Sequence, residues 1–444
     1  MESYILDWAN LLLRWLHVIT AIAWVGSSFY FVFLDSSLTP PVDEDLKKQG
    51  VNGELWAVHG GGFYHPVKFN VSPPKLPDHL HWFYWESYTT WLSGFALLTV
   101  SYLWNAKIYL VNPADPNAMS SGAAIASALA FLVVFWLLYD GICRVFGQRK
   151  NGDATVGAMV LVLVCIAAYL ACHIFPGQAA FLLMGAMLAT SMSANVFFWI
   201  IPGQRTVVKA LKEGQPVDPI HGKRGKQRSV HNTYFTLPVL FAMLSNHYGW
   251  LYSHAQNWLV LILMMFAGAA IRQFFVMRHG FKLGRNPHPW PYALVGVLVL
   301  IGTAAWLKPA APAAAPAAVP AAAPAAAPAE AQSPAAAPGG EAAAPAAAPE
   351  APAPAAPAAP AADGAVGYAQ MAPFFQQHCV VCHGAALQQK NVRLDSPEQV
   401  QAHAQQIYQQ VVQLRKMPFG NPGALSDDER NMVKRWYESG ASVK

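Results

Sequence analysis

The sequence predicts an all-α protein: an eight-helix transmembrane bundle, an extended linker and a small helical domain at the C-terminal end. Charged residues make up 12% of the 444 residues and hydrophobic residues 54%, whereas about 25% of residues are charged in soluble globular domains. Long apolar stretches recur through residues 1–308 and then stop. An Ala/Pro-rich tract at 309–363 follows, and residues 364–444 return to an ordinary globular composition.

Eight segments offer the roughly 20 apolar residues that a helix needs to cross a bilayer. We place them at about 8–34, 82–104, 122–146, 155–174, 179–201, 231–250, 256–278 and 290–308. Helices are expected because every backbone amide in lipid needs a partner inside its own segment. The first segment is too long for the apolar part of a signal peptide, and no basic residue precedes it, so we expect it to be retained.

Lysine and arginine are divided unequally between the predicted loops. The loops after the first, third, fifth and seventh helices carry four, three, seven and three of them, and the opposite side carries only Lys107 and Lys308. Basic loops stay on the cytoplasmic side of a membrane. We therefore expect a multi-pass protein of the bacterial inner membrane, with the N-terminus and the C-terminal domain facing the periplasm.

The tract at 309–363 is almost entirely alanine and proline. It offers no large apolar side chains, so it cannot build a core and is predicted to be a disordered linker. Proline-rich spacers extend by roughly 3.1 Å per residue. The tract is therefore predicted to act as a tether.

The C-terminal domain contains the sequence Cys379-Val380-Val381-Cys382-His383. This C-x-x-C-H pattern is the attachment signal for c-type haem. Cys379 and Cys382 lie one helical turn apart and can each bond one haem vinyl group, while His383 lies beneath the iron. A redox dithiol or half of a zinc site would also use two cysteines at this spacing, but no second C-x-x-C occurs in the chain. The sequence therefore predicts a small cytochrome c domain of the class I type.

Three helices are expected in this domain, at about 367–378, 397–414 and 426–439. The last begins with Ser426-Asp427-Asp428-Glu429, which is a capping-box pattern. The acidic residues of this turn also suit the positive end of a helix.

Met417 is the candidate for the second axial ligand of this iron. It lies 34 residues after His383, in a loop that contains Pro418 and Pro422. Ligation by histidine and methionine raises the reduction potential of a haem and suits an electron acceptor. His378 and His403 are the alternative ligands.

Several ionisable residues lie inside the predicted membrane helices, where such residues are costly and are therefore candidates for function. Histidines that face each other across helices can hold a b-type haem. Given the predicted topology, His173 and His247 lie at similar depth near the outer side, and His17 lies somewhat deeper. These three are candidate ligands of a haem b, and the alternative is that they bond to neighbouring helices.

Three stretches resemble a known family. They are the run from Leu13 to Tyr30, which includes Arg14, His17, Trp24 and Gly26; the loop His59-Gly60-Gly61-Gly62-Phe63-Tyr64-His65; and the segment His231-Asn232-Thr233-Tyr234. With eight helices and a tethered cytochrome c, the chain resembles the membrane-bound urate oxidase (urate hydroxylase) family. The start of the first helix alone is also similar to a membrane-bound protoporphyrinogen oxidase.

The resemblance implies oxidation of urate with water to 5-hydroxyisourate, without release of hydrogen peroxide. The electrons are then expected to pass to the fused cytochrome c and on to a terminal cytochrome c oxidase or a soluble cytochrome. The implied cofactors are haem c and, in the membrane domain, haem b. The expected partners are urate, the electron acceptor and the lipid bilayer, and no nucleic acid.

Urate is a planar anion, so its site needs polar donors and an aromatic wall. The candidate substrate-binding residues are His59, His65, Arg228, Asn232 and Thr233. Glu86 is the candidate general base and His231 a second catalytic candidate; Glu86 could instead form an ion pair with Arg272. The three glycines between His59 and His65 either let the backbone approach a ligand closely or form a flexible loop.

Two other functions fit the same composition. A quinol-oxidising electron-transfer subunit with a tethered cytochrome c would respond to quinols and ignore urate. A transporter or sensor would be expected to carry paired broken helices from an inverted repeat, and the sequence contains no convincing internal repeat.

Overall fold

A computed structural model describes residues 2–69, 73–111, 118–308, 366–385, 392–413, 415, 417–418 and 425–443. The described chain is mostly helical. The predicted linker at 309–363 lies outside the described residues.

A helix lies on each of the eight predicted membrane segments. The helices of this region are α1 (Glu2–Ser37), α2 (Glu44–Lys48), α3 (Trp85–Leu98), η1 (Thr99–Leu103), α4 (Ala106–Tyr109), α5 (Ser121–Phe146), α6 (Gly152–Ile174), α7 (Gly177–Asn195), η2 (Val196–Ile200), α8 (Ile201–Lys212), α9 (Pro219–Leu244), η3 (Ser245–His247), α10 (Gly249–Tyr252), α11 (Asn257–Lys282) and α12 (Trp290–Trp306).

Five helical stretches of the described chain are long and apolar enough to cross a membrane. They are Tyr4–Ser37, Ser121–Phe146, Gly152–Ile174, Gly177–Lys212 and Asn257–Lys282. The other three predicted spans are helical, but each is shorter or more polar than these five stretches. α3 has 14 residues before it continues as the π-helix η1, α12 has 17, and the first turns of α9 are basic and polar.

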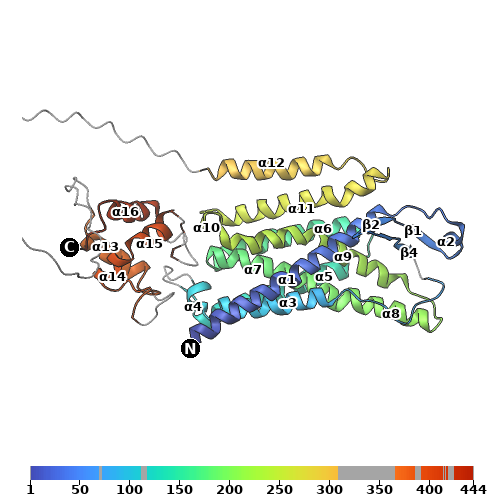
Figure 1. The fold of residues 1–444 in the computed structure, drawn as a ribbon, viewed down its shortest axis with the longest axis horizontal. Helices are drawn as coiled ribbons and strands as arrows, with labels where there is room; N and C mark the ends of the chain where they lie inside the picture. Colours follow the sequence, from blue (N-terminus) through green and yellow to red (C-terminus); the bar gives the residue numbers. More distant parts are fainter. Residues whose placement is uncertain are drawn as a thin grey trace, which may run out of the picture.

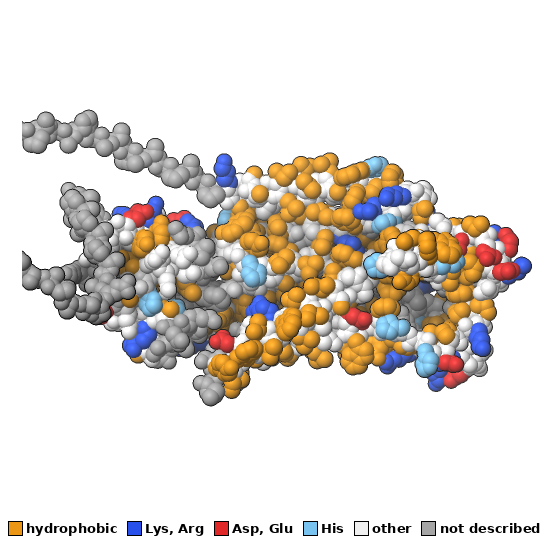
Figure 2. Space-filling view, viewed as in Figure 1, with side chains coloured by type: hydrophobic (Ala, Val, Ile, Leu, Met, Phe, Trp, Pro, Cys, Tyr) orange, Lys and Arg blue, Asp and Glu red, His pale blue; other side chains and the backbone are white. Residues whose placement is uncertain are grey.

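The helices run back and forth between two ends of the bundle (Figure 1). The N-terminus, α4 and α10 lie at one end, and α2, α8 and the small strands lie at the other. Hydrophobic side chains cover the surface between these ends, and charged side chains gather mostly toward them (Figure 2). Such an apolar belt is what a bilayer requires of the helices that it surrounds.

The core of the bundle is built around α7. Most of its residues are buried, and it packs against α5, α6 and α9. Small residues allow this close approach: a Cβ added at Gly185 would lie 2.9 Å from Cβ of Ala242 on α9. Close packing through small residues is typical of helices in membranes.

The first loop forms four short strands, which the all-α prediction did not include. They are β1 (Val51–Glu54), β2 (Ala57–His59), β3 (Gly62–Tyr64) and β4 (Val67–Phe69), paired antiparallel as β1–β4 and β2–β3. Gly60 and Gly61 connect β2 to β3 with φ of +58° and +80°. Two consecutive positive φ values are the mark of a type I′ hairpin turn, which favours glycine. The glycine run therefore makes a tight turn.

Glu54 holds this loop together. Its carboxylate accepts a hydrogen bond from the backbone N–H of Val42 (2.7 Å) and pairs with Nε2 of His65 (2.7 Å). The His65 ring in turn stacks on Trp56, with ring centroids 4.0 Å apart. The Val42 N–H, followed by His65, lowers the pKa of Glu54 below its ordinary value.

The C-terminal region has its own core. Its helices are α13 (Tyr368–His378), α14 (Pro397–Ala402), α15 (Ala404–Tyr408), η5 (Gln409–Gln413) and α16 (Asp427–Glu438), close to the three predicted ones. Phe375 of α13 meets Trp436 of α16 edge-on, at 5.4 Å between ring centroids. The predicted capping box is present, because the side chains of Ser426 and Glu429 each accept a hydrogen bond from the other residue's backbone N–H.

We expect Glu54→Gln to loosen the first loop at pH 7. A carboxyl whose pKa is lowered on folding stabilises the fold above its unfolded pKa and loses that contribution as the pH falls through the folded value. The difference between wild type and variant should therefore be largest at neutral pH and shrink as the pH falls through the lowered pKa of Glu54. Amide hydrogen exchange of residues 51–69 measures it. Glu44→Gln is the control, since Glu44 forms only an exposed pair with Lys47; an equal loss of protection in both variants would contradict the role of Glu54.

Candidate functional site

Polar side chains from four helical elements meet inside the bundle. We call this group the buried polar cluster: Tyr139 and Asp140 of α5, Asn195 of α7, Trp199 of η2, and Arg228, His231 and Asn232 of α9. It lies on the half of α9 that is closer to the basic loop. Two predicted substrate residues and one predicted catalytic residue are thereby brought together.

The carboxylate of Asp140 is the centre of the cluster. One oxygen accepts hydrogen bonds from Nη2 of Arg228 (2.7 Å) and from the Trp199 indole (2.7 Å). The other accepts from Nε of Arg144 (2.6 Å). Arg228 is 3% exposed, and its Nη1 also donates to Oδ1 of Asn195 at 3.2 Å. A buried ion pair of this kind is strongly favourable only when both partners are hydrogen-bonded, as they are here.

A chain of hydrogen bonds leads from this pair to His231. Nδ2 of Asn195 donates to the Tyr139 hydroxyl (2.9 Å), which lies 2.8 Å from Nδ1 of His231. Because the hydroxyl oxygen already accepts from Asn195, we assign its own proton to His231. Nδ1 is then the acceptor, and Nε2 carries the imidazole proton. This network orients His231 and makes it a hydrogen-bond donor through Nε2.

Asn232 and Thr233 also have hydrogen-bond partners in this region. Asn232 accepts from Asn195 (2.9 Å) and donates to the Met192 carbonyl (3.0 Å). The Thr233 hydroxyl donates to the carbonyl of Ser229 on its own helix (3.1 Å). With Arg228 tied to Asp140, each of these predicted substrate-binding residues already has a hydrogen-bond partner in the protein.

The remaining predicted substrate and catalytic residues lie elsewhere. His59 is exposed at the end of β2, and His65 is paired with Glu54 in the first loop. Glu86 is half-buried in the first turn of α3. In the described part of the chain no ion pair joins Glu86 to Arg272, which instead lies over the ring of Phe29.

The three histidines predicted as haem b ligands have different surroundings. His17 lies between α1 and α3, with Nδ1 3.0 Å from the Thr90 carbonyl oxygen. His173 is exposed and lies 2.7 Å from the Tyr169 carbonyl oxygen of its own helix. His247 is exposed in η3. No described contact joins any of these three side chains to another, so haem b stays a prediction.

Sequence reasoning missed Tyr139, Asn195 and Trp199 as parts of the cluster. The one available signal was the pair Asp140 and Arg144, which lie four residues apart and so on one face of a helix. Nothing in the spacing of α5, η2 and α9 indicates which of their residues meet, because that depends on how the helices pack.

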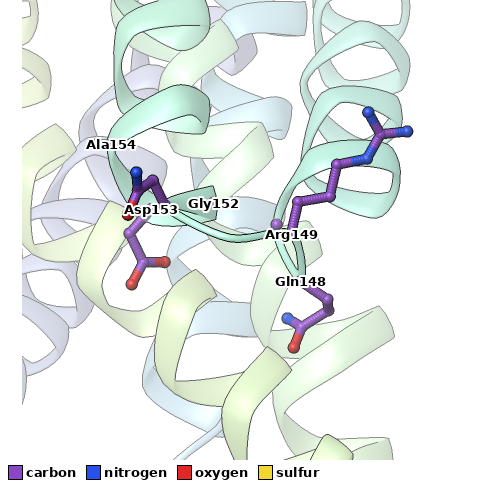
Figure 3. A pocket seen from close by; sticks show the side chains of 7 residues that line it. Gln148, Arg149, Gly152, Asp153 and Ala154 are labelled. Carbon is purple, nitrogen blue, oxygen red and sulfur yellow. The ribbon is translucent and has the colours of Figure 1, made fainter.

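Two surface pockets among the described residues are lined by no member of the cluster. One, of about 440 Å³, is formed by the turn between α5 and α6. Figure 3 shows Arg149 pointing away from Asp153, which accepts a hydrogen bond from Gln227 at 2.7 Å. The other, of about 550 Å³, lies beside Glu54, Trp56 and His65.

The residues of the C-x-x-C-H motif have the arrangement that haem attachment needs. Cys379 and Cys382 are free, and the backbone N–H groups of Cys382 and His383 both donate to the Cys379 carbonyl (3.1 and 2.9 Å). Nδ1 of His383 lies 3.2 Å from the Val392 carbonyl oxygen, which leaves Nε2 available to an iron. Burial raises the pKa of the Cys379 thiol to about 12, whereas a redox dithiol has a lowered one. The site therefore fits a covalent haem.

Met417 lies at the edge of the same core. Its backbone N–H donates to the Gln410 carbonyl at 3.2 Å. The thioether takes no part in this hydrogen bond. Of the alternative ligands, His378 is engaged through Nε2 with Glu429 at 3.2 Å, and Nδ1 of His403 lies 3.0 Å from Oε1 of Gln406. His378 is thus engaged through a ring nitrogen that an iron would need, while Met417 and His403 both stay candidates for the second ligand.

We expect Asp140→Asn to destabilise the bundle strongly. Removing one partner of a buried pair leaves an uncompensated charge, here that of Arg228, at a cost of about 3–5 kcal/mol. Chemical denaturation in detergent, followed by tryptophan fluorescence, measures this loss. Asp45→Asn should cost less than about 1 kcal/mol, because its pair with Lys48 is exposed. A double variant Asp140→Leu, Arg228→Met should lose less than Asp140→Asn alone; a greater loss would contradict the assignment.

Comparison with known proteins adds an identification of the membrane region. Searches of curated proteins and of solved structures find no match to the chain. The Urate oxidase N-terminal family matches residues 3–308, which run from the first turn of α1 to the end of α12 and include the whole buried polar cluster. This match spans well over half of the chain. The protein therefore belongs to the Urate oxidase N-terminal family and is an oxidoreductase related to urate oxidase.

Proposed function

We propose that this protein is an integral-membrane urate oxidase that passes its electrons to a fused C-terminal cytochrome c. In the proposed reaction, water adds its oxygen to urate to give 5-hydroxyisourate, and two electrons and two protons leave. Molecular oxygen is not reduced at the site, so no hydrogen peroxide forms. The family match over residues 3–308 is the observation that carries this proposal.

The C-terminal domain supports the choice of electron acceptor. Cys379 and Cys382 lie one turn apart, Cys379 and Met417 pack against the same small core, and His383 contacts the carbonyl of Val392, which also packs against it. A haem c bound there would accept one electron at a time. A tether keeps such an acceptor at high local concentration without a permanent complex. The final acceptor is proposed to be a terminal cytochrome c oxidase or a soluble cytochrome.

Two side chains are proposed to manage the protons. Glu86 is half-buried at the start of α3, and no hydrogen bond or ion pair of its carboxylate is found among the described residues. A carboxylate without such a partner is free to accept a proton from urate or from the attacking water. His231 is held by Tyr139 and presents Nε2–H, which can donate to a developing negative charge.

We also propose that the protein lies in the bacterial inner membrane, with its N-terminus and cytochrome domain in the periplasm. The N-terminus, α4 and α10 lie at one end of the bundle, together with helices α13–α16 (Figure 1). The more basic loops belong to the other end. Both features agree with a cytoplasmic position for the basic loops.

Anaerobic addition of urate to the purified full-length protein should reduce its haem c. Reduction should appear as sharpening of the α-band, with two haems reduced for each urate consumed. Xanthine and a short-chain quinol serve as parallel controls. Reduction by the quinol but not by urate would overturn the proposal in favour of a quinol-oxidising subunit.

Met417→Ala should leave haem c covalently attached but change its axial ligation. We expect loss of the sulfur-to-iron charge-transfer band near the red end of the spectrum and a lower reduction potential, because a thioether stabilises the reduced iron. His403→Ala is the matched control and should change neither. An unchanged spectrum in Met417→Ala would remove this residue from the site.

A further inference from the structure

Arg272 lies near the middle of α11 and is 4% exposed. Its guanidinium group packs over the ring of Phe29 on α1, 3.9 Å from the ring centroid. Nε and Nη2 are both buried, and neither has a hydrogen-bond partner in the described part of the chain. These two nitrogens form one edge of the planar guanidinium, the edge that binds two neighbouring acceptors at once.

The positive charge of Arg272 is also without a carboxylate partner among the described residues. Its one electrostatic neighbour there is the phenol of Tyr234, which is neutral at neutral pH. Arg228, the other buried arginine of the bundle, is by contrast paired with Asp140. An unpaired buried charge in a membrane helix is costly and is a functional candidate by default.

The side chains next to Arg272 are polar, and one of their hydrogen bonds is to a weak acceptor. The Tyr234 hydroxyl donates to Oε1 of Gln273. The amide nitrogen of Gln273 has a thioether as its acceptor, Sδ of Met277 at 3.0 Å, and sulfur is a weak acceptor. A guanidinium edge, an amide and an aromatic ring therefore gather between α1, α9 and α11, and these three helices are in contact.

We propose that Arg272 binds the substrate anion through its Nε–Nη2 edge, and this proposal rests on the proposed function. A urate monoanion presents a carbonyl oxygen beside a deprotonated ring nitrogen. These two acceptors are spaced much as in a carboxylate, which suits a bidentate guanidinium. Lipid phosphate is a poorer fit, because the two unpartnered nitrogens of Arg272 are buried inside the bundle and do not face the lipid. Gln273 and Phe29 complete the polar and aromatic contacts.

The test is equilibrium binding of labelled urate to the purified, detergent-solubilised full-length protein, without an electron acceptor. Arg272→Gln should weaken binding at least tenfold, and Arg272→Lys should also weaken it, because lysine keeps the charge but not the fork. Arg278→Gln is the matched control: Arg278 lies on the same helix and also over an aromatic ring, that of Phe275 at 5.7 Å. Its binding should equal that of wild type.

Folding is checked separately by thermal unfolding without urate. Arg272→Met should melt at or above the wild-type temperature, because it removes a buried unpaired charge, and should lose the upward shift that urate gives to wild type.

Wild-type affinity in Arg272→Gln would overturn the inference, as would loss of non-covalently bound haem from that variant, which would make a porphyrin propionate the anion. Urate binding that depends on Arg272 without oxidation would overturn the proposed function alone. Urate oxidation with unchanged binding in Arg272→Gln would overturn this inference alone.

Discussion

A polar group inside an apolar helical bundle has no water to bond to, so it must find its partner within the protein or in a ligand. The ion pair of Asp140 and Arg228 meets this requirement most completely, with donors from α5, η2 and α9 converging on one carboxylate. The contacts that satisfy Asp140 also determine how these helices pack. Asn195, Tyr139 and His231 take their positions from the same network.

The same requirement separates the two buried arginines of the membrane region. Arg228 is satisfied by the protein and so acts as a structural residue, although its charge and position suggested a substrate contact. Nε and Nη2 of Arg272 have no partner among the described residues, and this buried charge lowers the stability of the fold unless an anion binds to it. Binding sites in proteins often retain such an unmet requirement, which the ligand then meets.

The membrane region and the C-terminal region divide the proposed reaction between them. The bundle offers candidate groups for protons and for the anion, such as Glu86, His231 and Arg272, while the C-terminal region holds the two thiols, the histidine and the thioether that are proposed to bind a haem. A carboxylate that handles protons needs freedom from strong partners. A haem site needs the opposite, with ligands held in place by other bonds, such as that from the Met417 backbone to Gln410.

The sequence by itself determined the positions of the membrane helices, the cytochrome motif and the capping box at Ser426, because apolar length, the C-x-x-C-H spacing and helix capping are local properties of the chain. It also suggested the family through local segments. The strands of the first loop were missed, since two glycines with positive φ make a hairpin that apolar periodicity does not reveal. Only the tertiary structure decided that Arg228 has a carboxylate partner and that Arg272 has none among the residues that the structure describes. That difference depends on which side chains of other helices face each arginine, and helix packing brings together residues that are far apart in the sequence.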